Sequence, residues 1–311
     1  MLLAWSGLAS TAGATTDPIP VRNDPAFVEG APTARGAWLG WSQNRVGRLH
    51  PHTFLVQRGD GPRIRVNARG TRGMCGGIVG HRVIYLQQRR RPSRTVFRIL
   101  RFDLRTRQRS PLPPAVNRAI DGNLRTFPFG NVSVSGRWLM YTAMTVDVAQ
   151  GESWGTVVVY DRRTGRPRQI TWDNGYDTSV YAGQVSGHYA TWVWLDQSGY
   201  GDPASKVYRY DTRTGRKVAI PGDAATYQHD PAVSADGTVY FFRTVVGWLP
   251  GSATTHELVR QVPGGTAQVV AQIASTEGSA APHATFVRDR PDGTHVVFFA
   301  VNGDVEKVVD G

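Results

Sequence analysis

The sequence predicts an all-β protein, a six-bladed β-propeller whose blades are four-stranded antiparallel sheets. A glycine turn that leads into an aromatic strand recurs six times, a Tyr/Phe-Asp hairpin phrase follows several of these turns, and no long helical periodicity appears. Repeat steps of 44, 56, 51, 50 and 56 residues are typical of propeller blades. The turn glycines are Gly36, Gly80, Gly136, Gly187, Gly237 and Gly293.

Each repeat is predicted to contain four strands, here called A to D in chain order. Strand A precedes the glycine turn, strand B is rich in aromatic residues, and strand C ends at the Tyr-Asp pair. The phrase "VYDRRTGRPRQIT" begins at Val159, and "RYDTRTGRKVAIP" begins at Arg209. In both phrases an aspartate can accept hydrogen bonds from the turn, and a glycine, Gly165 or Gly215, can take positive φ. Strands such as "TVVVY" are apolar on both faces, as expected between neighbouring blades.

The two ends of the chain predict how the ring closes. The last repeat has room for only three strands before Gly311, whereas "PIPVRN" at 18–23 is an extended segment with no partner of its own. We therefore expect this N-terminal segment to form the fourth strand of blade 6. One domain, 15–311, is predicted, with blades near 31–67, 74–113, 130–171, 181–221, 230–270 and 283–311 plus 18–23.

Two phrases carry a resemblance to a known family. The segments "VSADGTVYFF" and "VVVYDRRTGRPRQIT" resemble the WD-like repeats of TolB-like six-bladed propellers. The resemblance covers about 18–311, although blade 2 lacks the Thr-Gly pair and blade 1 lacks the Tyr-Asp pair. It implies the architecture but no particular function, because this fold serves many chemistries.

The N-terminus favours export. Residues 1–14 resemble part of a signal peptide, with an apolar stretch followed by Ala12-Gly13-Ala14, although a positively charged n-region is missing. No apolar run reaches the roughly 18–20 residues of a membrane span. The single cysteine, Cys75, allows no internal disulfide. We expect a monomeric protein that is secreted or associated with the cell envelope.

Positive charge is concentrated in the first two blades. Residues 1–126 carry a net charge of +15, and residues 127–311 carry −3. One interpretation is that blades 1–2 bind an anionic polymer or surface through Arg89, Arg90, Arg91 and Arg94. The other is the codon bias of a GC-rich genome, because 33 of the 36 cations are arginine.

Long connections predict which face binds. The D–A and B–C connections are longer than the A–B and C–D turns, and long loops on a rigid scaffold usually carry binding sites. The candidate binding residues lie in these connections or at the starts of A strands: Asn131, Trp154, Trp172, Tyr176, Tyr181, Tyr227, His229, Asp230, Trp248 and His283.

Two histidines and a carboxylate could form a site at the tunnel mouth. His229, Asp230 and His283 precede or begin strands A of blades 5 and 6, so they are candidate metal ligands or general bases. No local metal-binding spacing supports this, and strand alternation predicts that His229 and Asp230 face opposite ways. A pair of histidines is therefore expected more than all three ligands together. A structural role for Asp230 in its turn remains the alternative.

The predicted function is a non-catalytic, exported propeller that binds a protein, peptide or glycan. The alternatives are a lyase or hydrolase with a metal or histidine site at the tunnel mouth, and a protein whose basic blades bind an anionic polymer. No G-x-S-x-G elbow and no phosphate-binding glycine motif occurs. No cofactor is indicated apart from a divalent metal in the tunnel.

Overall fold

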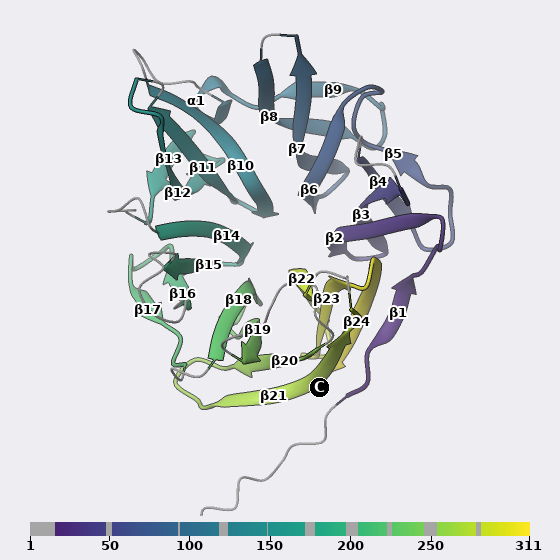
Figure 1. Ribbon diagram of the computed structural model, residues 1–311, viewed down its shortest axis with the longest axis vertical. Coiled ribbons are helices and arrows are strands. Elements are labelled where there is room, and N and C mark those ends of the chain that lie inside the picture. Colours follow the sequence, from purple (N-terminus) through teal and green to yellow (C-terminus); the bar gives the residue numbers. More distant parts are fainter. Residues whose placement is uncertain are drawn as a thin grey trace, which may run out of the picture.

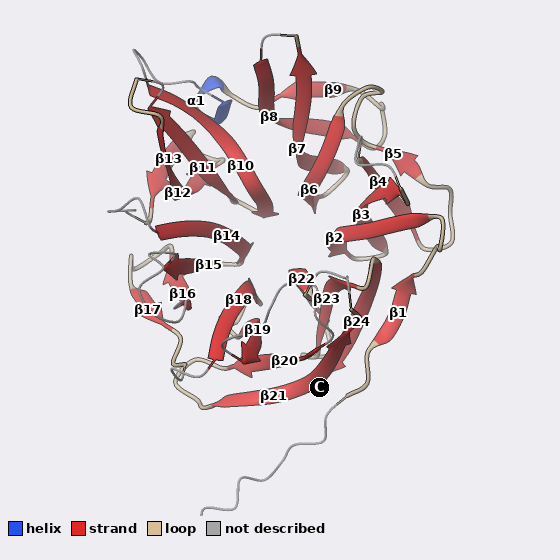
Figure 2. Ribbon diagram, in the orientation of Figure 1, coloured by secondary structure: helices blue, strands red, loops and turns tan. Residues whose placement is uncertain are grey.

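Six four-stranded antiparallel sheets form a ring around a central tunnel (Figures 1 and 2). The computed structural model describes residues 16–47, 52–92, 94–117, 124–147, 149–171, 178–196, 205–222, 226–245, 254–277 and 281–311. Within these ranges the one helix is the short α1 (Pro114–Asn117), and no helix is long and apolar enough to cross a membrane. The predicted six-bladed propeller is confirmed.

Strands A to D follow one another outward from the tunnel in each blade. Blades 1 and 2 consist of β2 (Phe27–Arg35), β3 (Trp38–Arg45), β4 (Thr53–Arg58) and β5 (Ile64–Arg65), then β6 (Arg72–Val79), β7 (Arg82–Arg91), β8 (Arg94–Asp103) and β9 (Arg109–Pro111). Blades 3 and 4 consist of β10 (Leu124–Ser135), β11 (Trp138–Asp147), β12 (Glu152–Asp161) and β13 (Arg166–Gln169), then β14 (Thr178–Ser186), β15 (Tyr189–Asp196), β16 (Ser205–Asp211) and β17 (Lys217–Ala219). Blade 5 consists of β18 (Thr226–Val233), β19 (Val239–Val245), β20 (Thr254–Gln261) and β21 (Ala267–Ser275).

The N-terminal strand closes the ring, as predicted. Blade 6 contains β22 (His283–Asp289), β23 (His295–Val301) and β24 (Asp304–Asp310), and its outer strand is β1 (Ile19–Arg22), antiparallel to β24 (Figure 1). Val21 packs against two apolar clusters, one around Phe298 of blade 6 and one around Trp41 of blade 1. The first strand therefore joins the last blade to the first.

The repeated Tyr-Asp phrase is the hairpin between strands C and D. Gly165 and Gly215 have φ of 72° and 74°, so the predicted left-handed conformation is confirmed. In the first copy Asp161 accepts a hydrogen bond from the Arg163 N–H at 3.0 Å. In the second copy Asp211 accepts one from the Arg213 N–H at 2.8 Å. The aspartate thus holds the turn in both copies.

Every inner strand is interrupted by a bulge at the same level of the tunnel. The pairing of strand A with strand B skips two residues in each blade: 31–32, 74–75, 130–131, 183–184, 230–231 and 284–285. Ala31, Asp230 and Ala284, which begin three of these bulges, have positive φ although they are not glycine. Bulges re-aim side chains that would otherwise alternate. This ring of six bulges determines which side chains face the tunnel.

Candidate functional site

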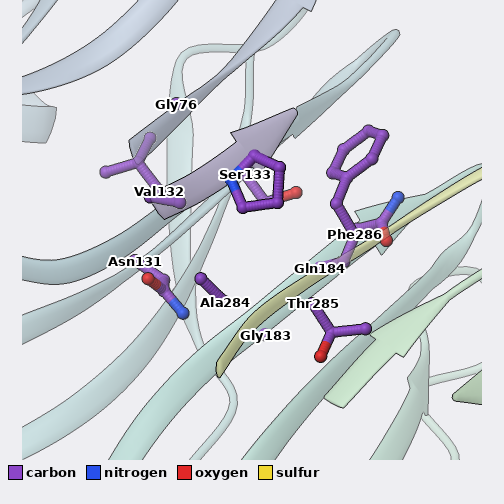
Figure 3. A pocket seen from close by; sticks show the side chains of 11 residues that line it. Gly76, Asn131, Val132, Ser133, Gly183, Gln184, Ala284, Thr285 and Phe286 are labelled. Atoms are coloured by element: carbon purple, nitrogen blue, oxygen red, sulfur yellow. The ribbon is translucent and has the colours of Figure 1, made fainter. Parts of the chain in front are cut away.

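Three cavities follow one another along the tunnel. One of about 210 Å³, here called the mouth chamber, opens where the inner strands begin, on the face of the long D–A and B–C connections. A small cavity of about 30 Å³ lies among the bulges, with Asn131, Gln184 and Thr285 in its wall (Figure 3). A third, of about 370 Å³, lies at the tight A–B turns.

Gln184 crosses the tunnel between blades that are not neighbours. Its side chain leaves β14 of blade 4, donates a hydrogen bond to the Val287 carbonyl of blade 6 at 2.8 Å and accepts one from the Val287 N–H at 2.7 Å. Gln184 is only 3% exposed. Figure 3 shows its amide beside Phe286. The crossing separates the mouth chamber from the tight-turn end of the tunnel.

The mouth chamber combines apolar walls with a few polar side chains. Val28, Gly30 and Met74 contribute to its walls, and its polar lining includes Ser42, His52, Arg72, Asn131 and His283. A Cβ at Gly30 would lie 3.6 Å from the His283 Nε2, which is an ordinary contact distance and places this ring beside β2. Cavities of this composition are typical of ligand sites.

Arg72 is the main cation of the mouth chamber. It is the first residue of β6, and its terminal NH2 group donates to the Nε2 of His52 at 3.0 Å. Its Nε is buried and has no hydrogen-bond partner. Burial, and then the charge of Arg90, lower the pKa of Arg72. A desolvated guanidinium of this kind is suited to an anionic ligand.

Glu29 lines the same chamber but is associated with other cations. Its side chain is 2% exposed, and neither carboxylate oxygen has a hydrogen-bond partner. Burial raises the pKa of Glu29, while Arg22 and Arg63 act in the opposite direction. Arg72 is not among the cations that act on it.

His229 and Asp230 form a hydrogen-bonded pair at the tunnel end of blade 5. The His229 Nδ1 lies 3.1 Å from the Asp230 Oδ2, and the second carboxylate oxygen of Asp230 accepts from the Ala284 N–H at 2.9 Å. Burial tends to raise the pKa of Asp230, but the hydrogen bond and charge of His229, with a contribution from His283, leave it lowered. The expectation that His229 and Asp230 face opposite ways is wrong, because Asp230 begins a bulge with φ of 47°.

The pair continues into a polar chain that spans blade 5. The His229 Nε2 lies 3.0 Å from the Thr244 Oγ1, which lies 2.6 Å from the His256 Nδ1. The His256 Nε2 in turn lies 3.1 Å from the Ser275 Oγ. These residues belong to β18, β19, β20 and β21, so the chain runs from the tunnel to the rim. Thr244 and His256 are buried, which indicates a structural role for the chain.

The three candidate metal ligands are not gathered into one centre. Within the described ranges no group of three or more His, Cys, Asp or Glu side chains could hold a metal ion. Both ring nitrogens of His229 lie within hydrogen-bond distance of Asp230 and Thr244. The Nδ1 of His283 bonds to the Ala281 carbonyl at 3.0 Å, and its ring lines the mouth chamber.

The other predicted binding residues divide into three groups. Tyr227 is half-buried, and burial, followed by the charges of Tyr181 and Asp230, raises its pKa. Trp154 lies opposite Thr145 in blade 3 and lines none of the three tunnel cavities. Three candidates lie outside the described residues: Trp172, Tyr176 and Trp248.

Sequence reasoning did not select the residues that matter most in the tunnel. His52, Arg72 and Gln184 were not among the candidates. Gln184 is the second residue of its bulge, as Asn131 is in blade 3, and Arg72 stands two residues before its bulge, as Tyr181 does. Alignment of the six A strands on their bulges would have pointed to both.

The arginines proposed for anionic polymers do not form a loop. Arg89, Arg90 and Arg91 belong to β7 and pair with residues of β8, so the hairpin is longer than expected. Side chains alternate along a strand, and Arg90 therefore points away from its two neighbours. Arg94 begins β8. The structure thus places Arg89, Arg90 and Arg91 on two sides of the exposed end of one strand and not on a single loop.

His256 predicts a pH dependence of stability. Burial, and then the charge of His229, lower the pKa of His256 to about 4. The unfolded chain, with a histidine pKa near 6.5, therefore takes up the proton first as the pH falls. The contribution of neutral His256 is complete above about pH 6.5 and declines toward pH 4. Between pH 7 and pH 5 we expect the free energy of unfolding to fall by about 2 kcal/mol.

Urea denaturation at the two pH values, with His256→Gln as the comparison, measures this effect. The variant should lose most of the pH dependence. An unchanged dependence in His256→Gln would assign the effect to another group.

The comparisons with known proteins identify the fold. No protein-family model and no curated protein matches the sequence. Among solved structures, a protein assigned as TolB from Agrobacterium tumefaciens is similar, with a TM-score of 0.56 and 13% identity over 91% of this chain and 90% of that chain. An oligogalacturonate lyase in complex with manganese is also similar, with a TM-score of 0.51 and 11% identity over 94% of this chain and 85% of that one. At these identities the likeness shows the fold alone: the chain has the six-bladed propeller fold that the TolB structure also has.

Proposed function

We propose that this chain is an exported, non-catalytic binding protein that holds a protein, peptide or glycan at the long-loop face. The observation that supports this most is the mouth chamber, which opens on that face and draws its walls from blades 1, 2, 3 and 6. A rigid ring with a recess at its centre suits the binding of a protruding segment of a partner. Export is supported by the resemblance of residues 1–14 to part of a signal peptide.

The geometry favours binding over catalysis. The clearest acid–base pair is His229 with Asp230, but the second nitrogen of His229 faces the buried Thr244. Asp230 is committed to the backbone of the neighbouring blade through Ala284. Neither group is therefore directed at a bound substrate, as a general base must be.

Blocking the chamber tests the proposal. Asn131 lies in the wall of the mouth chamber, and Asn131→Trp should fill part of it. Binders selected against the folded protein from a random peptide library and from a glycan array should lose at least about tenfold in affinity for this variant, which is about 1.4 kcal/mol.

The matched control is Arg105→Trp, at an exposed position of a C–D turn on the opposite face. It should bind like the unmodified protein. If every selected binder tolerates Asn131→Trp, the binding site is not the mouth chamber and the proposal fails.

A further inference from the structure

We propose that the mouth chamber binds a carboxylate group of a peptide, with Arg72 as the residue that recognises it. The inference rests on the proposed function for the location of the site and adds the chemical class of the ligand. It is carried by the accessible donor of the Arg72 guanidinium, by the absence of an ion-pair partner for it in the described residues, and by the apolar part of the lining.

The guanidinium of Arg72 has unused donors. In the described residues its side chain makes one hydrogen bond, to His52, and the buried Nε–H makes none. Because a guanidinium has no lone pair to share, the Nε2 of His52 is the acceptor in this contact. The contact fixes one terminal nitrogen of the guanidinium. The other terminal nitrogen makes no hydrogen bond to a described residue and is not among the buried atoms, so a ligand in the chamber can reach it. Arginine often binds a carboxylate through two parallel N–H groups.

The chamber provides no counter-charge for Arg72. No carboxylate lies within ion-pair distance of it in the described part of the chain, and the one acidic residue in the lining, Glu29, is acted on by Arg22 and Arg63. The charge that acts on the pKa of Arg72 is that of a second cation, Arg90. A partly buried charge without a partner is costly, so an anion that entered the chamber would be stabilised there.

The lining favours a carboxylate on a peptide over a phosphate or a sugar acid. One partly buried guanidinium matches the single charge of a carboxylate, while a phosphate dianion would need further cations in direct contact. Val28, Met74 and Ala284 line the chamber and can pack against an aliphatic side chain. The hydroxyl groups of a sugar would find no partner on these three side chains and would depend on polar lining residues such as Ser42 and Asn131.

Small probes test the assignment on the full folded chain. We would titrate N-acetyl-leucine, N-acetyl-leucinamide, D-glucuronate and inorganic phosphate, and measure binding by NMR saturation transfer and by the shift of the Arg72 Nε–H signal. That signal is assigned by its absence from Arg72→Lys. N-acetyl-leucine should bind saturably, and its neutral amide should bind at least about tenfold more weakly.

Variants separate recognition from folding. Arg72→Gln should reduce the affinity for N-acetyl-leucine to that of the amide, and Arg72→Lys should retain part of it. Arg82→Gln, at the other end of the same blade, is the control and should change nothing. Should Arg72→Gln fail to fold, the comparison of acid with amide on the unmodified protein still decides the matter.

Several results would overturn the assignment. These are equal binding of acid and amide, no saturable binding of the acid, or tighter binding of glucuronate or phosphate than of N-acetyl-leucine. The outcome is distinct from that of the proposed function. Library binders that require Asn131 but tolerate Arg72→Gln would retain the function and reject the carboxylate. If N-acetyl-leucine binds through Arg72 but no library binder depends on Asn131, the carboxylate assignment stands and the proposed function fails.

Discussion

A chain that starts at Asp24 should be less stable than one that starts at Thr16 by about 3–5 kcal/mol. The truncation removes β1, the only outer strand of blade 6, and leaves the edge of β24 without a partner. It also exposes the apolar clusters of blades 6 and 1 that Val21 covers. The difference in the free energy of unfolding, measured by urea denaturation of both chains, checks the expectation.

A point variant tests the same contact without shortening the chain. Val21→Asp keeps the backbone pairing with β24 but places a charge between the two clusters. It should lower the unfolding free energy by about 2 kcal/mol. Ile19→Asp, at an exposed position of the same strand, is the control and should have little effect. Equal stability of the two truncated chains would show that β1 does not close the ring.

Replacing Gln184 by alanine should lower the free energy of unfolding by about 3–4 kcal/mol. The substitution leaves both the N–H and the carbonyl of Val287 without the partners that they have across the tunnel. It also removes a buried side chain from a narrow part of the tunnel. Urea denaturation of Gln184→Ala and of the unmodified chain measures the loss.

The matched control is Gln169→Ala, which removes an amide from an exposed outer strand. Gln169 also donates to a backbone carbonyl, that of Thr171 at 2.9 Å, but water can replace this bond. The control should lie within about 0.5 kcal/mol of the unmodified protein. If Gln184→Ala changed the free energy of unfolding as little as the control, water would be replacing the missing amide and Gln184 would not be required to stabilise the ring.

The architecture could be predicted from the sequence because its signals are local. Each signal lies within a few residues. A turn contains its own glycine, and the turn aspartate accepts a hydrogen bond from an N–H two residues later. The aromatic strand follows directly after a glycine turn. Six such units in tandem, with a last unit that lacks its outer strand, leave a closed ring with an N-terminal strand as the consistent arrangement. Gly165, Gly215 and β1 behave as those patterns predict.

Which side chains face the tunnel could not be predicted from the sequence. Strand alternation predicts opposite side-chain directions for His229 and Asp230, but a bulge brings the Asp230 carboxylate within hydrogen-bond distance of the His229 imidazole. Arg72 and His52 belong to different blades and meet only when the sheets pack side by side, and Gln184 reaches a residue 103 positions later in the chain. Local patterns specify which segments form strands, whereas the contents of the tunnel depend on two-residue bulges and on contacts between blades, which have no local signature in the chain.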